Sequence, residues 1–162
     1  MYDIINTYQI GMNWKGNYIM RFTLEQDYSI RIIYELCRND DKRLDVGELS
    51  SLTGVTPLFT QKIMRKLTAS GLVESKKGVR GGYTLAAGRN PSNISLCDVF
   101  EATAGEMCIN ACLGHSYECT RPEVVENEGN CCIQKAIKLL NKDLIEALSS
   151  VTFEKILNNK ND

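Results

Sequence analysis

The chain has 162 residues, of which 43% are hydrophobic and 24% are charged, and its formal net charge is -1. This composition is ordinary for a folded protein and argues against disorder, and no apolar run approaches the length that a membrane-spanning helix needs. The N-terminus lacks the pattern of a secretion signal, so we expect a cytoplasmic protein without a membrane partner. In that compartment seven cysteines indicate metal binding or redox sensing, not structural disulfides.

The charge is divided unevenly along the chain. Residues 20–90 carry 12 Lys/Arg and 8 Asp/Glu, a net charge of +4, whereas residues 91–162 carry 6 and 11, a net charge of -5. Only the first part is therefore expected to face a polyanion. Residues 1–19 show no sustained hydrophobic period, and we interpret them as an N-terminal extension. Translation that begins at Met20 is one hypothesis for it, and a genuine added strand or arm is the other.

Three helices are predicted in the basic part. The first spans Thr23 to Asn39, where apolar residues recur at helical spacing after a threonine that can cap the helix. The second, Val46 to Leu52, ends at Gly54, which can adopt the left-handed conformation of a sharp turn. The third spans Pro57 to Ser70, with Thr56 as its N-cap and proline as its first residue. Two helices joined by a tight glycine turn are typical of a helix-turn-helix, whose second helix can enter a major groove.

The third predicted helix has two different faces. Its expected core face carries Phe59, Ile63, Met64 and Leu67. The opposite face carries Gln61, Lys62, Arg65, Lys66 and Thr68. A polar face of this kind can be simply solvated, so the assignment to DNA depends on the segment that follows.

The stretch "LVESKKGVRGGYTL" predicts two short strands, Leu72 to Ser75 and Tyr83 to Leu85, around a glycine-rich loop. The loop carries Lys76, Lys77 and Arg80. We interpret the hairpin as a β-wing, because a cationic tip suits phosphates or the narrow minor groove. A hairpin that only aids solubility is the alternative.

The segment "VTPLFTQKIMRKLTASGLVESKKGVRGGYTLA", with "ISLCDVFEATAGE" and a cysteine cluster behind it, resembles a family of bacterial winged-helix regulators. The family includes the iron-sulfur cluster regulator, the nitric-oxide-sensing repressor and the cysteine-metabolism repressor. The resemblance implies a mainly α protein with a winged helix-turn-helix domain of three helices and a two-stranded β-wing over 20–90. A cysteine-rich loop and a long C-terminal dimerisation helix would follow within 91–162. It also implies a homodimer that binds double-stranded DNA at a partly palindromic operator and holds a [2Fe-2S] or [4Fe-4S] cluster.

The resemblance further assigns the DNA-reading residues. Base-reading positions fall on Thr56, Leu58, Gln61 and Lys62, and Lys77 falls at the wing tip. The expected DNA-binding surface is completed by Arg65, Lys76 and Arg80. Several relatives have a glutamate where this chain has Gln61, and an amide donates as well as accepts hydrogen bonds, so the preferred bases can differ.

The cysteine-rich region follows a further helix, which a capping box at Ser95 and Asp98 predicts to run through Thr103. In the loop 106–132 the cysteines follow the spacing C-x3-C-x6-C-x11-C-C, unlike the paired C-x2-C knuckles of zinc ribbons. Soft thiolates in a glycine-bearing loop favour an iron-sulfur cluster, with zinc as the alternative.

The resemblance gives a candidate ligand set of Cys108, Cys112, Cys119 and Cys132. Cys108 and Cys119 match the first two family ligands, Cys132 matches the third because it precedes a helix, and Cys112 is the fourth thiolate. This chain has an additional cysteine and a longer gap than the family pattern. Cys131 therefore competes with Cys132, and His115 is either a ligand or a solvated loop residue.

The final helix is predicted over 133–148, where Ile137, Leu140, Leu144 and Leu148 form an apolar stripe that further apolar residues broaden. A helix that is apolar over so much of its circumference needs partners on two flanks, and the resemblance implies that one is a second protomer.

The sequence as a whole predicts a DNA-binding regulator that senses cluster status, redox or nitrosative stress. The alternative is a cluster-free repressor controlled by a Cys108–Cys119 disulfide switch, structural zinc or a partner protein. We do not expect an enzyme, because the sequence offers neither a phosphate-binding glycine motif nor a nucleophile paired with a general base.

Overall fold

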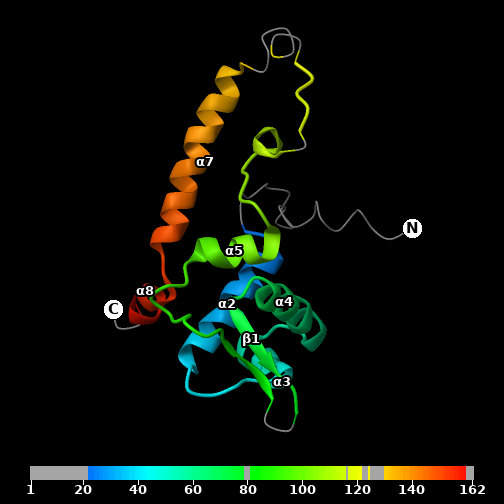
Figure 1. The fold of residues 1–162 in the computed structure, drawn as a ribbon, viewed down its shortest axis with the longest axis vertical. Helices are drawn as coiled ribbons and strands as arrows, with labels where there is room; N and C mark the ends of the chain where they lie inside the picture. Colours follow the sequence, from blue (N-terminus) through cyan, green and yellow to red (C-terminus); the bar gives the residue numbers. More distant parts are fainter. Residues whose placement is uncertain (1–21, 79–80, 116, 122–123, 125–129, 160–162) are drawn as a thin grey trace, which may run out of the picture.

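The computed structural model describes residues 22–78, 81–115, 117–121, 124 and 130–159, so the predicted extension over 1–19 lies outside the described residues. The helices are α2 (Leu24–Arg38), α3 (Val46–Thr53), α4 (Pro57–Ala69), α5 (Leu96–Ala104), the 3-10 turn η2 (Ala111–Leu113), α7 (Cys132–Ser150) and α8 (Phe153–Asn158). The strands are β1 (Val73–Lys76) and β2 (Gly82–Leu85). The predicted order of three helices and a two-stranded wing is confirmed. Figure 1 shows these elements gathered at one end of the molecule, with α7 rising away from them.

The predicted helix starts are confirmed, and each carries a local signal. Thr23 and Gln26 form a capping box at the start of α2, and Asp45 and Glu48 form another at α3. In each pair the cap side chain accepts a backbone N–H that has no partner within the helix. Gly54 ends α3 with a φ of 71°, the left-handed conformation expected there.

One hydrophobic core joins the first three helices to the later elements. Ile32 and Ile63 from α2 and α4 belong to the same buried cluster as Ile94, Val99 and Phe153. The core therefore extends past residue 90, where the sequence suggested that the DNA-binding unit ends. Because α5 and α8 pack on the helix-turn-helix, a shift of either element would change the packing of the core that supports α4.

The wing is tied to the segment before α3. β1 and β2 pair antiparallel, and Leu44 adds a bridge to Tyr83 through N–H···O bonds of 3.0 and 2.8 Å. Gly82 has a φ of 131°, and a Cβ there would lie 2.9 Å from the carbonyl oxygen of Leu44, so the close approach requires glycine. These contacts fix the direction of the wing relative to the helix-turn-helix.

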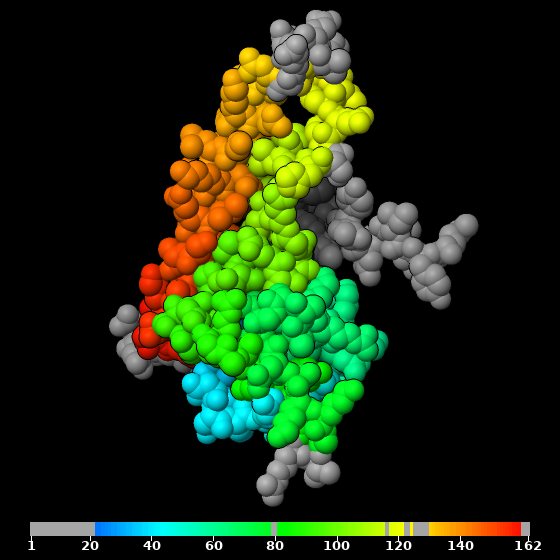
Figure 2. All heavy atoms as spheres, in the orientation of Figure 1, coloured from blue at the N-terminus to red at the C-terminus, as the bar shows by residue number. Residues whose placement is uncertain are grey.

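The long helix α7 extends one residue before and two residues beyond the predicted range of 133–148. Leu139 and Leu140 are 63% and 60% exposed, so part of its apolar stripe has no cover in one chain. Figure 2 shows the cysteine-rich loop running along the side of this helix. Within the described residues, no helix is both long enough and apolar enough to span a bilayer.

Candidate DNA-reading face and cysteine pocket

The outward face of α4 carries the side chains that the sequence assigns to DNA. Exposed positions are Thr56, Leu58, Gln61, Lys62 and Arg65. The inward face buries Thr60, Ile63, Met64 and Leu67, while Phe59, expected in the core, is only half-buried. Leu58 is 81% exposed, more than any other large hydrophobic residue that the structure describes.

The start of α4 leaves a polar group free. Thr56 occupies the N-cap position as predicted, but its side chain makes no capping hydrogen bond. Pro57 at the first position has no N–H, so the first turn of α4 has one donor fewer to satisfy. The side chains of Thr60 and Ser50 lie 3.3 Å apart, which joins α4 to α3 beneath the outward face.

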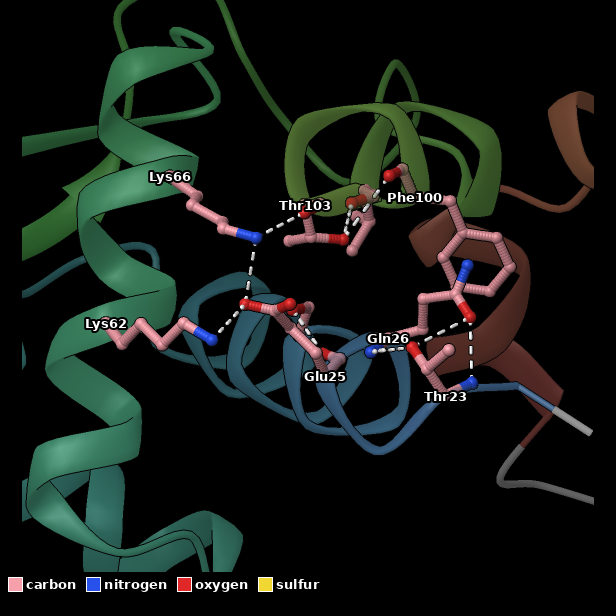
Figure 3. Close-up of polar contacts among 9 residues, drawn as sticks. Thr23, Glu25, Gln26, Lys62, Lys66, Phe100 and Thr103 are labelled. Carbon is pink, nitrogen blue, oxygen red and sulfur yellow. Dashed lines mark hydrogen bonds and ion pairs between the residues drawn. The ribbon is translucent and has the colours of Figure 1, made fainter. Parts of the chain in front are cut away.

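Two lysines of α4 turn toward the neighbouring helices. Glu25 Oε1 lies 3.5 Å from Lys62 Nζ and 3.0 Å from Lys66 Nζ. Lys66 also donates a 2.5 Å hydrogen bond to the backbone carbonyl of Thr103 in the last turn of α5. Figure 3 shows the three helices meeting at these side chains. Lys66, expected on the open polar face, is therefore held between α2 and α5, whereas Lys62 is more exposed.

The residues that the sequence failed to identify here are Glu25 and Thr103. Glu25 stands in the first turn of a helix, where an acidic residue is favourable for local reasons alone. Thr103 takes part through its backbone, which carries no sequence signal. Only the packing of α4 between α2 and α5 brings these groups together.

The wing presents part of its expected basic surface. Lys76, at the end of β1, and Lys77, which follows it, are exposed. Arg80 lies outside the described residues. At the base of the wing Arg43 forms a 2.6 Å ion pair with Glu74, so that arginine is bound to the wing strand.

Three cysteines of the loop 106–132 line one cavity of about 350 Å³. They are Cys112, Cys119 and Cys131, and the remaining lining residues are Asn110, Tyr117, Arg121, Val124, Ile133, Gln134 and Ile137. Cys108 is half-exposed and does not line this cavity. Cys132 points outward and is exposed, also outside it.

Cys131 is the N-cap of α7. Its Sγ accepts a 3.4 Å hydrogen bond from the backbone N–H of Gln134 and lies 3.6 Å from a guanidinium nitrogen of Arg121. The Gln134 N–H is the main cause that lowers the pKa of the Cys131 thiol, with a smaller contribution from the Arg121 charge. A thiolate is favoured there because the first turn of a helix carries partial positive charge.

Side chains of α7 hold the loop in place. Gln134 donates a 2.6 Å hydrogen bond from Nε2 to the backbone carbonyl of Cys112. At the middle of the helix, Asn141 binds the carbonyl of Met107 and the N–H of Ile109. The loop is thus attached to α7 at both its first and second cysteines.

The donor atoms suit a soft metal group in kind, because three thiols line the cavity and no carboxylate of the described residues does. Among the residues that the structure describes, no three His, Cys, Asp or Glu side chains are grouped closely enough to hold a metal ion. Tying these thiols together therefore requires the loop to move. His115 is exposed and lies 3.4 Å from the carboxylate of Glu106, outside the cavity.

Comparison with known proteins gives a consistent result. Residues 22–159 match the Rrf2 family model, described as an iron-dependent transcriptional regulator. The chain is 30% identical over 142 residues to Protein aau3 of Rhizobium meliloti, covering 83% of this chain and 90% of that protein. It is 27% identical over 132 residues to the HTH-type transcriptional regulator NsrR of Halalkalibacterium halodurans, covering 81% of each.

The fold also matches solved structures. The structure of CymR, the global cysteine regulator of B. subtilis, superposes with a TM-score of 0.65 at 19% identity, covering 87% of this chain and 98% of that one. At this identity the likeness concerns the fold alone.

Proposed function

The chain belongs to the Rrf2 family of iron-dependent transcriptional regulators, and we propose that it is a homodimeric DNA-binding regulator that senses iron-sulfur cluster status or redox or nitrosative stress. The observation that carries the DNA part is the exposed face of α4. It combines Thr56, Gln61 and Lys62 with an uncovered leucine, on a helix whose other face is fully engaged with the core.

The reading face suits a major groove. Side chains near the start of a recognition helix reach base edges, which places Thr56, Leu58 and Gln61 at the bases. The resemblance places Lys62 at a base-reading position, but its ammonium group is a point charge that also suits a phosphate, and we propose that role here for Lys62 and for Arg65, farther along the same face. Lys76 and Lys77 on the wing, with Arg80, would contact the backbone or minor groove beside it.

A second protomer would cover the apolar stripe of α7. The exposed Leu139 and Leu140 support this role, since a two-fold contact between two such helices buries both stripes at once. Pairing also sets the two recognition helices about 34 Å apart, one turn of DNA. A partly palindromic operator follows from that symmetry.

The proposed cluster ligands are the loop thiols Cys108, Cys112 and Cys119 with one thiol from the start of α7. Sequence spacing favours Cys132 for the last, but the cavity favours Cys131, because its side chain faces the same space as Cys112 and Cys119. An iron-sulfur cluster, when bound, would supply bonds to several thiolates at once and so join the loop to α7. We therefore assign the helix-start position to Cys131.

The chain's own residues provide the response. Gln134 and Asn141 hold the loop against α7. A guanidinium nitrogen of Arg121 lies 3.6 Å from the Cys131 sulfur, and the loop begins directly after α5. Drawing the thiols together would change the path of this loop, and the change would reach α5 and the dimer helix. DNA affinity would then differ between the two states by as much as that rearrangement favours or disfavours the DNA-bound arrangement.

The DNA part is tested with alanine variants. Lys62→Ala and Lys77→Ala should each weaken binding to a duplex selected from random-sequence DNA. Each removes one lysine from both protomers, so each should lower the dependence of the logarithm of affinity on the logarithm of salt concentration by about 1.8, or about 0.9 per phosphate contact. Lys142→Ala is the matched control, because Lys142 lies on α7 and pairs with Glu146. Unchanged affinity in both reading-face variants would overturn the assignment of this surface.

The sensing part is tested by anaerobic reconstitution with iron and sulfide. Visible absorbance, with iron and sulfide bound, is expected for the wild-type protein. Protein that remains colourless would exclude the cluster, and one zinc per chain would identify the zinc alternative.

A thiol switch is the second candidate, supported by the three thiols that share one cavity. Two thiols would lose two protons and two electrons to form a disulfide, and hydrogen peroxide would accept them to give two waters. The sequence pairs Cys108 with Cys119, whereas the cavity favours pairs among Cys112, Cys119 and Cys131. Peptide mapping of peroxide-treated protein, with and without reductant, distinguishes these pairs.

A further inference from the structure

The last turn of α5 makes an unusual contact with the recognition helix. The final carbonyls of a helix have no partners within it. At Thr103 that partner is the ammonium group of Lys66, at 2.5 Å, from α4. Figure 3 shows this contact between Lys66 and Thr103. The helix ends directly afterwards at Gly105, and the cysteine loop begins.

We propose that Lys66 is a positioning residue that couples the cysteine loop to the DNA-reading face. The inference rests on the proposed DNA binding, and it names the contact through which the loop and the recognition helix affect each other. Lys66 itself does not belong to the reading face, because its side chain is turned inward between α2 and α5.

The contact is partly shielded from water. The side chains of Lys66 and Glu25 are 37% and 23% exposed, so water competes only partly for their charges. Glu25 Oε1, 3.0 Å away, balances the ammonium charge while Thr103 supplies the neutral acceptor. Removing the ammonium would take the charge-assisted donor from the Thr103 carbonyl and leave Glu25 with only the more distant Lys62, at 3.5 Å.

The short connection to the loop transmits displacement. Thr103 is held by Lys66, and only four residues later the carbonyl of Met107 accepts a 3.0 Å hydrogen bond from Asn141 of α7. A segment fixed at both ends absorbs little movement. A change in the loop or in α7 therefore displaces the Thr103 carbonyl.

The other end of the contact lies beside the reading face. Lys62 stands one turn before Lys66 on α4 and shares the same Glu25 oxygen, at 3.5 Å. When Thr103 moves, the distance between the Lys66 ammonium group and Glu25 Oε1 changes. The distance between Lys62 and the same oxygen then changes as well. The position of a lysine that we place at DNA thus depends on the end of α5.

Coupling is reciprocal, so DNA should also act on the loop. The test is hydrogen exchange followed by mass spectrometry on the full-length, metal-free, reduced protein, with and without a duplex selected from random-sequence DNA. In the wild type, DNA should slow exchange of the amides in 104–110 by at least about fivefold, the lower end of ordinary coupling between sites.

Two variants and one control make the test specific. Lys66→Met keeps the length of the side chain but removes the charge, and it should abolish the DNA-induced slowing in 104–110. Lys66→Arg keeps a cationic donor and should restore most of it. Lys142→Met makes the same change on α7 and should behave as wild type. Thermal unfolding of each variant shows that it is folded.

The outcomes separate this inference from the proposed function. Failure of the wild type to bind any duplex would overturn both. Binding without slower exchange in 104–110, or equal slowing in the Lys66→Met variant, would overturn the coupling while leaving DNA binding intact. Loss in Lys66→Met with recovery in Lys66→Arg would support the role of Lys66. The test does not require a cluster, so failure of the cluster proposal leaves it interpretable.

Discussion

The side-chain amide of Asn141 receives the backbone N–H of Ile109 at 2.9 Å, and its NH2 group donates to the neighbouring carbonyl of Met107 at 3.0 Å. A single residue of α7 thus satisfies both a donor and an acceptor of the loop backbone. Because Met107 and Ile109 flank Cys108, the two hydrogen bonds fix where the cysteine loop starts relative to the long helix.

Removing this contact should loosen the start of the loop. Asn141→Leu removes both hydrogen bonds, whereas Asn141→Asp keeps the acceptor for Ile109 and loses the donor to Met107. Each lost bond should speed amide exchange in 107–113 by about fivefold, because a net hydrogen bond contributes about 1 kcal/mol. Lys142→Leu, at the next and exposed position, is the control. Equal exchange in all four proteins would show that the loop is held by other contacts.

Glu25 should restrain DNA binding. Its carboxylate holds Lys62 at 3.5 Å, so Glu25→Gln would release a lysine of the reading face toward phosphates. Affinity for non-specific duplex DNA should rise, and the salt dependence should steepen by up to about 1.8 if each protomer of the dimer gains one phosphate contact. Asp27→Asn removes the same charge from the same helix, but Asp27 pairs with Arg31 and not with α4. A similar gain in that variant would mean that net charge alone is responsible.

Leu58 should read thymine. An apolar side chain that is 81% exposed near the start of the recognition helix suits the C5-methyl group of that base. Replacing thymines of a selected duplex by uracil, one at a time, should weaken wild-type binding at one position or at its symmetry mate. The Leu58→Ala variant should bind the thymine-containing duplex and the uracil-substituted duplex with similar affinity. Leu52→Ala, at an exposed position of α3, should keep the wild-type discrimination. Insensitivity of the wild type to every substitution would exclude methyl recognition.

Local rules account for most of the fold. Capping residues and glycine turns are signals within a few positions, so the starts of α2, α3 and α4 and the wing strands could be predicted within one or two residues. The capping box at Ser95 likewise placed α5. The shared core could not be predicted in this way, because Phe153 packs against α2 through contacts between distant parts of the chain.

The candidate site also has residues that the sequence predicts and residues that depend on tertiary contacts. Exposure of Thr56, Gln61 and Lys62 follows from the helical period, and the structure agrees with it. The inward turn of Lys66 depends on Glu25 and on a backbone carbonyl, neither of which has a sequence signature. Adjacent cysteines point in different directions from a helix start, so spacing alone could not decide between them.

Burial of Cys37 should make stability depend on pH. Burial in the core raises the pKa of this thiol from 9.0 to about 12, with a smaller contribution from the charge of Asp40. The folded state therefore favours the protonated thiol. The resulting stabilisation is complete below the unfolded pKa and is lost as pH rises from about 9 to about 12, with a slope of up to about 1.4 kcal/mol per pH unit.

Denaturant unfolding under reducing conditions at several alkaline pH values measures this effect. The free energy of unfolding should fall more steeply with pH for the wild type than for Cys37→Ala, whatever constant packing loss the variant carries. Asp40→Asn should keep most of the slope, since burial is the larger cause. Parallel profiles for wild type and Cys37→Ala would contradict a buried, protonated thiol.

Serine substitutions at the start of α7 should distinguish the two adjacent cysteines. Serine is a favoured N-cap, so Cys131→Ser can still accept the Gln134 N–H and keep the helix while removing the thiol from the cavity. After anaerobic reconstitution, Cys131→Ser should lose most visible absorbance and bound iron, whereas Cys132→Ser should retain them. Circular dichroism should show equal helix content in both. The reverse result would assign the ligand to Cys132, as sequence spacing suggests, and full cluster content in both variants would remove the helix start from the ligand set.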